Sequence, residues 1–231
     1  MIRLTIDGEP IEVQEGRTLL EACREHDIPI PTLCYHPALK PYGACRLCVV
    51  ELDHPSGSSK LVASCVHPCE EGAIVLTNSE AVMRNRRVTA ELLLAGAFDA
   101  PEIVALAKGL GVEEPRFRME ESESCVLCGL CVRACDEIVG VRAISLIHRG
   151  MAKKVATPFE ISSATCIGCG TCVLICPTGR LKLSDVTGYR GVHPWDNTFH
   201  RLYCRVCDDE DLRETRLQEA TDLIADMEAS E

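Results

Sequence analysis

The chain has 231 residues, of which 16 are cysteine and only four are Tyr, four Phe and one Trp. A chain so poor in aromatic residues forms thin cores, so small cysteine-rich domains need cross-links or metals to hold them together. The net charge is −11, from 35 acidic and 24 basic residues. This balance disfavours a nucleic-acid partner, which requires basic patches.

The N-terminal stretch MIRLTIDGEP has no basic segment followed by an apolar one, so we expect no secretory signal. We also expect no membrane span, because no stretch approaches the ~20 apolar residues that one needs. A cytoplasmic location follows. Cysteines stay reduced in the cytoplasm, which favours metal binding over a disulfide framework.

Residues 1–78 are predicted to form a strand-rich domain. RLTI and IEVQ flank the turn DGEP, which indicates a hairpin. Thr18 and Glu21 have capping-box spacing at the start of TLLEACREH, a helix that ends before the prolines of DIPIP. Further short strands are expected at 47–52 and 73–77. The sequence therefore predicts an α+β unit, a small sheet crossed by one helix.

Residues 79–119 are predicted to be helical, because SEAVMRNRRVTAELLLA and PEIVALAKGLG both repeat apolar residues at helical spacing. In the first segment the expected apolar face consists of Val82, Met83, Val88, Leu92 and Leu93. Residues 187–231 form a tail that begins irregularly and ends in an acidic amphipathic helix. That helix packs on its own domain or docks on a partner.

Residues 120–186 contain an internal repeat of period 41. CVLCGLCVRAC begins at 125 and CIGCGTCVLIC at 166, and both have the two-cluster ferredoxin spacing, in which the fourth cysteine of each run ligates the other cluster. The sequence therefore assigns two [4Fe–4S] clusters. Their ligands are Cys125, Cys128, Cys131 and Cys176 for the first, and Cys135, Cys166, Cys169 and Cys172 for the second.

The spacing within the repeat favours iron over zinc. Thiolates bind both metals, but a closed zinc site typically uses two separated pairs of ligands. Three cysteines at i, i+3 and i+6 instead wrap one turn of backbone around a single cluster. Gly129, Gly168 and Gly170 keep that backbone unobstructed.

A third group of cysteines lies in the first domain: Cys34, Cys45, Cys48 and Cys65. Plant-type [2Fe–2S] ferredoxins use a cysteine-rich loop followed by a distant fourth cysteine. The close pair and the distant fourth cysteine are present here, although the first gap is ten residues rather than four. The pattern favours a [2Fe–2S] cluster, with a zinc site as the alternative.

His200, Cys204 and Cys207 have the spacing H-x3-C-x2-C, and the next eight residues supply no further cysteine. A fourth iron–sulfur cluster, a zinc site and a pair of reduced thiols all remain open for them. The candidates for a fourth ligand are His193, Cys69, Cys23 and a partner chain.

Three further residues have ordinary interpretations. We interpret Cys69 as a packed neighbour of the [2Fe–2S] site, and Cys23 as a core residue on the apolar side of the first helix. His36 lies two residues after Cys34. We interpret it as an ordinary hydrogen-bonded or exposed histidine; the alternative is that it donates a hydrogen bond near the cluster and tunes the cluster's potential.

Several segments resemble a known family. PTLCYHP, GACRLCVVEL, ASCVHPCEEG and VTAELLLA are similar to the N-terminal part of the iron–sulfur subunit of NADH:quinone oxidoreductases, to the iron–sulfur subunit of NAD-linked hydrogenases and to the N-terminal region of [FeFe] hydrogenases. CVLCGLCVRACDEIVGVRAIS and TCIGCGTCVLICPTGRL resemble their dicluster module. The resemblance covers about residues 1–186. It implies a β-grasp [2Fe–2S] domain (1–78), a helical connector (79–119) and a bacterial-type dicluster domain (120–186).

The resemblance also implies a function. The chain would be a non-catalytic electron-transfer subunit of a soluble hetero-oligomeric complex, between a flavin subunit that oxidises NAD(P)H and a catalytic subunit. A hydrogenase is the favoured catalytic partner. A formate dehydrogenase, a transhydrogenase or another flavin-based bifurcating complex would keep the same role. A free-standing ferredoxin and a zinc-stapled binding module without a redox role are also compatible with the cysteine pattern.

One segment departs from the family. There, H-x3-C-x2-C-x5-C follows directly after the LLLA helix and holds another [4Fe–4S] cluster. Here the segment reads LLLAGAFDAPEIVALAKG, without His or Cys. His200, Cys204 and Cys207 match the first three ligands of that motif about 100 residues later.

Overall fold

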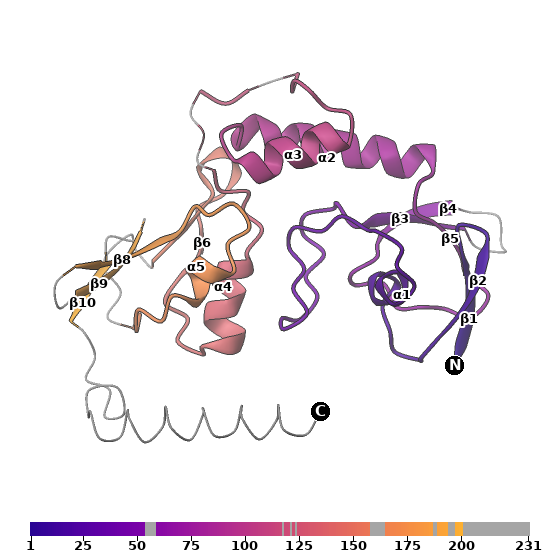
Figure 1. Cartoon of the computed structure of the whole chain (residues 1–231), viewed down its shortest axis with the longest axis horizontal. Coiled ribbons are helices and arrows are strands. Elements are labelled where there is room, and N and C mark those ends of the chain that lie inside the picture. Colours follow the sequence, from indigo (N-terminus) through magenta and orange to yellow (C-terminus); the bar gives the residue numbers. More distant parts are fainter. Residues whose placement is uncertain are drawn as a thin grey trace, which may run out of the picture.

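The protein is represented by a computed structural model. It describes residues 1–53, 59–116, 118–120, 122, 124–157, 165–186, 189–193 and 197–200. Figure 1 shows a sheet domain and a cysteine-rich domain side by side, with helices α2 and α3 lying above them. The loop between α1 and β3 occupies the side of the sheet domain that faces α4.

The sheet domain contains five strands in the order β2-β1-β5-β3-β4. Their bounds are Ile2–Ile6 (β1), Glu9–Val13 (β2), Val49–Asp53 (β3), Ser59–Ala63 (β4) and Ile74–Leu76 (β5). β1 is antiparallel to β2 and parallel to β5, and β3 is antiparallel to both β5 and β4. The predicted hairpin and the strands expected near 47–52 and 73–77 are therefore present. β4 escapes sequence analysis because its first three residues are exposed and no alternation is visible.

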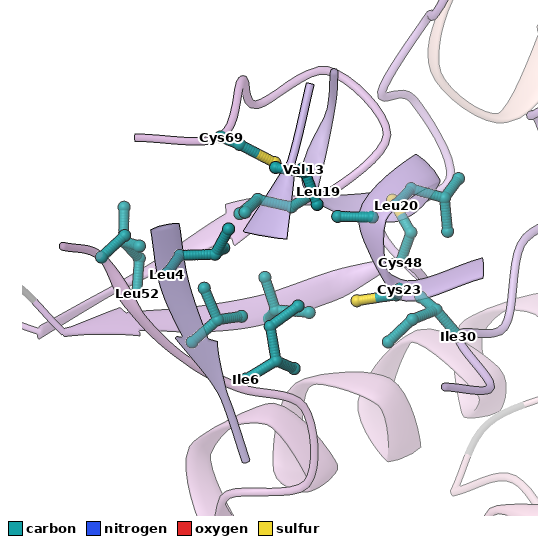
Figure 2. Close-up of a cluster of buried hydrophobic side chains, with 14 of the residues drawn as sticks. Leu4, Ile6, Val13, Leu19, Leu20, Cys23, Ile30, Cys48, Leu52 and Cys69 are labelled. Atoms are coloured by element: carbon teal, nitrogen blue, oxygen red, sulfur yellow. The ribbon is translucent and has the colours of Figure 1, made fainter. Parts of the chain in front are cut away.

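Helix α1 (Leu19–Glu25) crosses the sheet, and the predicted capping box is present. The Thr18 hydroxyl accepts from the Glu21 amide at 3.3 Å, while the Glu21 carboxylate accepts from the Thr18 amide at 2.8 Å. Figure 2 shows Leu19 of α1 beside Val13 of β2 in the core of the sheet domain. With seven residues, α1 is too short to be stable alone, so its packing on the sheet maintains it.

The start of α1 is also tied to the segment that carries Cys65. The amides of Leu19 and Leu20 donate to the carbonyls of His67 and Ser64 at 2.9 and 3.0 Å. Because these bonds flank Cys65 on both sides, the helix fixes where that thiol lies.

Helices α2 (Glu80–Gly96) and α3 (Pro101–Gly109) form the expected helical connector. The buried face of α2 differs from the predicted one, since Val88 and Leu92 are exposed. The side chains that α2 buries are Val82, Arg86, Ala90, Leu94 and Ala95. The sequence pattern misleads because this face includes an arginine and small residues, which a search for large apolar side chains passes over.

The turn between α2 and α3 is filled by small apolar side chains, including Ala97 and Ala100, that pack with Ile103. This is the segment LLLAGAFDAPEIVALAKG, which contains neither His nor Cys. Asp99 in the turn accepts hydrogen bonds from the hydroxyls of Ser122 and Ser124. It thereby ties the connector to the segment that leads into Cys125.

The two halves of the cysteine repeat adopt matching turns. Gly129 and Gly170 have φ of 74° and 77°, in the left-handed region that glycine tolerates, and each precedes a short helix. These helices are α4 (Leu130–Arg133) and α5 (Thr171–Leu174). Only after α4 does the described chain continue into a turn of π-helix, η1 (Ala134–Ile138), which carries Cys135.

The remaining elements are short. They are β6 (Ser145–Ile147), the 3-10 turn η2 (Gly150–Ala152), β7 (Lys154–Ala156), β8 (Lys182–Val186), β9 (Tyr189–His193) and β10 (Asn197–His200). β6 pairs with β7, and β8, β9 and β10 form an antiparallel sheet. The expectation of an irregular start to the tail is therefore wrong, because β9 and β10 occupy it. Cys204, Cys207 and the expected C-terminal helix lie outside the described residues.

None of the helices in the described part of the chain is both long and apolar enough to cross a bilayer. None of the fourteen cysteines in the same part forms a disulfide.

We predict that Thr18→Ala lowers the thermal stability of the holoprotein, with a loss of about 1 kcal/mol typical of a removed N-cap hydroxyl. Thr18→Ser retains the hydroxyl and is the matched control. Thermal unfolding followed by circular dichroism measures both. Equal midpoints for the two variants would mean that the capping box does not stabilise α1.

Candidate metal centres

The first group of thiols lies in the loop between α1 and β3 and in the turn after β4. Its members are Cys34, Cys45, Cys48 and Cys65. The amide of Cys45 donates to the Sγ of Cys34 at 3.4 Å, and the thiols of these two residues are hydrogen-bonded to each other. The thiols of Cys48 and Cys65 are hydrogen-bonded in the same way. The structure thus brings all four cysteines together as two contacting pairs.

In each pair one thiol deprotonates much more readily than the other. The hydrogen bond from Cys34 lowers the pKa of Cys45 to about 5, and the one from Cys65 lowers the pKa of Cys48 to about 6. The same bonds, together with burial, raise the pKa of Cys34 and of Cys65. Thiolates are the metal-binding form of cysteine, so Cys45 and Cys48 are the thiols of this group that most readily reach that form.

Gly43 allows the loop to approach Cys65 closely. Its amide donates toward the Cys65 sulfur, which lowers that pKa against the larger effects of Cys48 and burial. Its φ is 68°, and a Cβ at this position would lie 3.3 Å from the Cγ atoms of Val66. Any other residue would be strained and crowded here, so glycine is needed for the loop to close over the thiols.

The second group consists of Cys125, Cys128, Cys131 and Cys176, which line a cavity of about 300 Å³. Burial, reinforced by the nearby sulfurs of the same group, raises the pKa of Cys128 to about 11. Burial also raises the pKa of Cys176, but the amides of Leu181, Thr178 and Arg180 and the Thr178 hydroxyl outweigh it and lower that pKa overall.

The third group consists of Cys135, Cys166, Cys169 and Cys172, which line a narrower cavity together with Gly168 and Gly170. The amide of Ala143 donates to the Sγ of Cys135 at 3.3 Å, and the Thr171 hydroxyl lies 3.4 Å from the Sγ of Cys169. Each of the two cavities therefore receives three cysteines from one half of the repeat and one from the other half.

These donor sets fit iron–sulfur clusters. All are made only of thiols, and backbone amides point at several of the sulfurs, as in cluster sites, where hydrogen bonds to sulfur set the potential. The thiols of the second and third groups surround a volume, which is the arrangement that a cluster needs.

The first and second groups face each other across the two domains. The charge of Cys45 contributes to the raised pKa of Cys128, after burial and the nearer sulfurs. Leu39 from the loop of the first site packs with Leu130 and Ala134 of the second domain, and Cys128 borders that cluster. The two sites are therefore neighbours.

Arg133 joins the domains at this interface. Its Nη1 donates to the carbonyl of Cys34 at 2.9 Å, its Nη2 donates to the carbonyl of Lys40, and its Nε pairs with Glu137 at 3.2 Å. Glu137 in turn accepts from the Lys40 amide at 2.8 Å. The guanidinium also lies 5.1 Å from the centre of the Tyr42 ring. Its side chain is 12% exposed, and its bond to the Cys34 carbonyl is partly buried.

Sequence analysis missed Arg133 and two other residues that hold the sites. Arg86 donates to the carbonyls on either side of Cys48, and Ser64 donates to the carbonyl of Cys48 itself. The signal for Arg133 is its place inside the cysteine run, and the signal for Arg86 is its spacing from Val82 and Ala90 on one face of α2.

The remaining sequence candidates lie elsewhere. Cys23 and Cys69 are buried in the core of the sheet domain, and the Nδ1 of His36 accepts from the Ala38 amide within its own turn. The strand register gives the backbone separation of His193 and His200. In the register of β9 and β10, His200 pairs with Tyr189, four residues from His193 and so about 13 Å along the strand.

The comparisons with known proteins agree with this architecture. Residues 1–80 match the model of a 2Fe-2S iron-sulfur cluster binding domain, and residues 124–180 match that of a 4Fe-4S dicluster domain. In a crystal structure of NAD+-reducing [NiFe]-hydrogenase in the H2-reduced state, one chain is 30% identical, with a TM-score of 0.64; the match covers 77% of this chain and 85% of that one. The chain belongs to this family of iron–sulfur subunits.

Two curated relatives are much longer. A subunit of the NADH-quinone oxidoreductase of Rhizobium meliloti is 33% identical over 90% of this iron–sulfur chain, which spans 27% of that protein. NADP-reducing hydrogenase subunit HndD of Solidesulfovibrio fructosivorans is 34% identical over 78% of it, and the chain spans 36% of HndD. The expected fold class, a [2Fe–2S] domain followed by a dicluster domain, is confirmed.

We predict that Cys65→Ser abolishes the [2Fe–2S] signal, because it removes one of four thiols, whereas Cys69→Ser retains it, because Cys69 packs in the core. Iron analysis and electron paramagnetic resonance (EPR) spectroscopy of the anaerobically purified variants measure the difference. Loss of the signal in Cys69→Ser alone would exchange the two assignments.

We predict that Arg133→Ala loosens the contact between the domains. It removes the donor to the exposed carbonyl of Lys40 and leaves the partly buried carbonyl of Cys34 without its donor, the latter at a cost of about 1 kcal/mol. The magnetic interaction between the reduced clusters of the first and second sites should weaken, as measured by EPR. Arg142→Ala is the control, because Arg142 pairs with Asp136 on the exposed side of the same segment. An unchanged interaction in Arg133→Ala would contradict this role.

Proposed function

We propose that this chain is the electron-transfer iron–sulfur subunit of an NAD(P)-linked oxidoreductase complex. Cys34, Cys45, Cys48 and Cys65 would hold a [2Fe–2S] cluster, and the two crossed sets of the cysteine repeat would each hold a [4Fe–4S] cluster. The observation that carries the proposal is the serial order of the three thiol groups. Cys45 lies close enough to Cys128 of the second group to raise its pKa, and each half of the cysteine repeat contributes to both the second and the third group.

When bound, iron–sulfur clusters supply one-electron transfer over a range of potentials that the surrounding protein sets. The chain itself provides the spacing and the shielding. Leu39, Leu130 and Ala134 exclude water between the first two sites. Cys131, Cys135, Cys172 and Cys176 pack in one apolar cluster between the second and third.

The two ends of the series are accessible to different degrees. In the first group, Cys34, Cys48 and Cys65 are buried, whereas Cys169 of the third group is exposed. Ile167 and Leu174 beside it are exposed as well, Leu174 to 88%. An electron therefore leaves or enters the dicluster domain most directly at the third site.

We infer that the partners are a flavin subunit that oxidises NAD(P)H and a catalytic subunit, in a cytoplasmic hetero-oligomeric complex. A hydrogenase is the favoured catalytic partner, because a subunit of an NADP-reducing hydrogenase and a chain of an NAD+-reducing [NiFe]-hydrogenase are among the relatives. Formate dehydrogenase or another flavin-based bifurcating complex would use the same series of sites.

His200, Cys204 and Cys207 are proposed to bind a further metal whose fourth ligand comes from a partner chain. The support is their spacing and the register that separates His193 from His200. The metal content of the assembled complex separates this proposal from the alternative of reduced thiols. If the site binds metal, Cys204→Ser lowers the iron or zinc content of the complex, while the three other clusters are retained.

We predict that the anaerobically purified chain contains about ten irons, two from the [2Fe–2S] and four from each [4Fe–4S] cluster. NAD(P)H should reduce these clusters only when the flavin subunit is present. Iron and zinc analysis, together with absorbance during NAD(P)H addition, measures both results.

Two outcomes would count against the proposal. A colourless protein containing zinc would establish the zinc-stapled module instead. A chain that purifies alone from its native source and exchanges electrons with many unrelated donors would favour a free-standing ferredoxin.

A further inference from the structure

Arg86 is a buried cation next to the first site. It lies in the middle of α2 and is 3% exposed, which is unusual for arginine. Its Nε donates to the carbonyl of Leu47 at 3.1 Å, and its Nη2 donates to the carbonyl of Val49 at 2.9 Å. These carbonyls stand on either side of Cys48, so the guanidinium spans the backbone of a proposed cluster ligand.

No carboxylate forms an ion pair with Arg86 among the described residues, whose ion pairs all involve other arginines. Asp7 is the acidic group that influences it, but the Asp7 carboxylate is already engaged by the amide and hydroxyl of Thr77. A buried charge without a counter-charge is strongly destabilising. The chain must therefore provide negative charge near Arg86 in another form.

The sulfur of Cys48 is that negative charge. Burial lowers the pKa of Arg86, and the largest opposing effect comes from Cys48, ahead of Cys23 and Asp7. Cys23 keeps its proton, because burial raises its pKa to about 12. Cys48 instead belongs to the four-thiol site, and the Arg86 guanidinium is bonded to the carbonyls on either side of it. A [2Fe–2S] cluster with four thiolates is negatively charged in both oxidation states, and one-electron reduction adds a further negative charge.

We propose that Arg86 is the buried counter-charge of the first site and that it raises the reduction potential of the [2Fe–2S] cluster by stabilising the reduced form. Arg86 acts through the low dielectric of the interior, where charges interact far more strongly than in water. The inference rests on the proposed [2Fe–2S] site.

Arg86 shares the backbone of Cys48 with Ser64. The hydroxyl and the amide of Ser64 donate to the carbonyl of Cys48 at 2.7 and 3.1 Å. Three consecutive carbonyls, those of Leu47, Cys48 and Val49, are therefore satisfied by two residues. This arrangement separates two contributions: Ser64 holds the backbone without charge, whereas Arg86 holds it and supplies charge.

The test is the midpoint potential of the [2Fe–2S] cluster in the full chain. EPR-monitored redox titration follows this cluster at temperatures at which the faster-relaxing [4Fe–4S] signals are broadened. We expect Arg86→Met to shift the midpoint potential to a more negative value. At a fixed potential the ratio of oxidised to reduced cluster should rise about tenfold, which corresponds to about 59 mV for a one-electron couple. The potentials of the [4Fe–4S] clusters should change much less.

Arg84→Met is the matched control. Arg84 lies on the same helix and carries the same charge, but it faces solvent and pairs with Glu80 at 2.6 Å. Water screens it, so its removal should leave the potential unchanged. An equal shift in Arg84→Met and Arg86→Met would overturn the proposal, because net charge rather than burial would then be responsible.

A second pair of variants separates charge from shape. Arg86→Lys keeps the charge and Arg86→Gln loses it, while both retain a donor to the carbonyls. We expect the lysine variant to remain close to the wild-type potential and the glutamine variant to follow Arg86→Met. Equal potentials in the two variants would overturn the proposal.

The variants remain informative if some fail to hold the cluster. Loss of the cluster in the neutral variants but not in Arg86→Lys would support the counter-charge, whereas its loss in all three would show that the site needs the shape of arginine and would overturn it. Absence of a [2Fe–2S] signal in the wild-type chain would instead refute the proposed function.

Discussion

The guanidinium of Arg133 holds the two domains in their functional arrangement. It donates to the carbonyl of Cys34, within the loop of the first site, from the helix that carries Cys131 of the second. This hydrogen bond couples the two domains directly, because a movement of the dicluster domain would displace the backbone of Cys34 in the sheet domain. Glu137 completes the contact by pairing with Arg133 and accepting from Lys40.

The π-helical turn after α4 serves this contact. A π turn is rare and is often found at functional sites. Here it places Glu137 toward the loop of the first site while Cys135, two residues earlier, reaches the third group of thiols. In the second half of the repeat, Cys176 is followed by Pro177, and no such turn is assigned in the described residues there. The asymmetry between the halves matches their different contacts, since the polar bonds of Arg133 and Glu137 to the sheet domain come from the first half.

Arg133, which is partly buried, and Arg86, which is almost fully buried, have different roles in this protein. Arg133 is paired with a carboxylate and bridges two domains, so its charge is balanced within the protein. Arg86 donates to two backbone carbonyls, and Cys48 is the group that most opposes the lowering of its pKa by burial, ahead of Cys23 and Asp7. A carbonyl satisfies the hydrogen bonds of a guanidinium but not its charge. The first residue therefore sets geometry, and the second is suited to setting the potential of the site.

The sequence by itself determined the elements that follow from local spacing. The capping box of α1, the Asp7-Gly8 hairpin and the cysteine repeat are short-range patterns, and short-range patterns fix backbone turns. The crossed grouping of Cys135 and Cys176 was also predictable, because the ferredoxin spacing carries it. The buried face of α2 was not, because Arg86 reads as a surface residue until its neighbours are known. Tertiary structure alone decided that Cys45 lies near Cys128 and that Arg133 reaches Cys34, since these contacts join residues about 80 to 100 positions apart. Such contacts depend on how two separately folded surfaces fit, which no local pattern encodes.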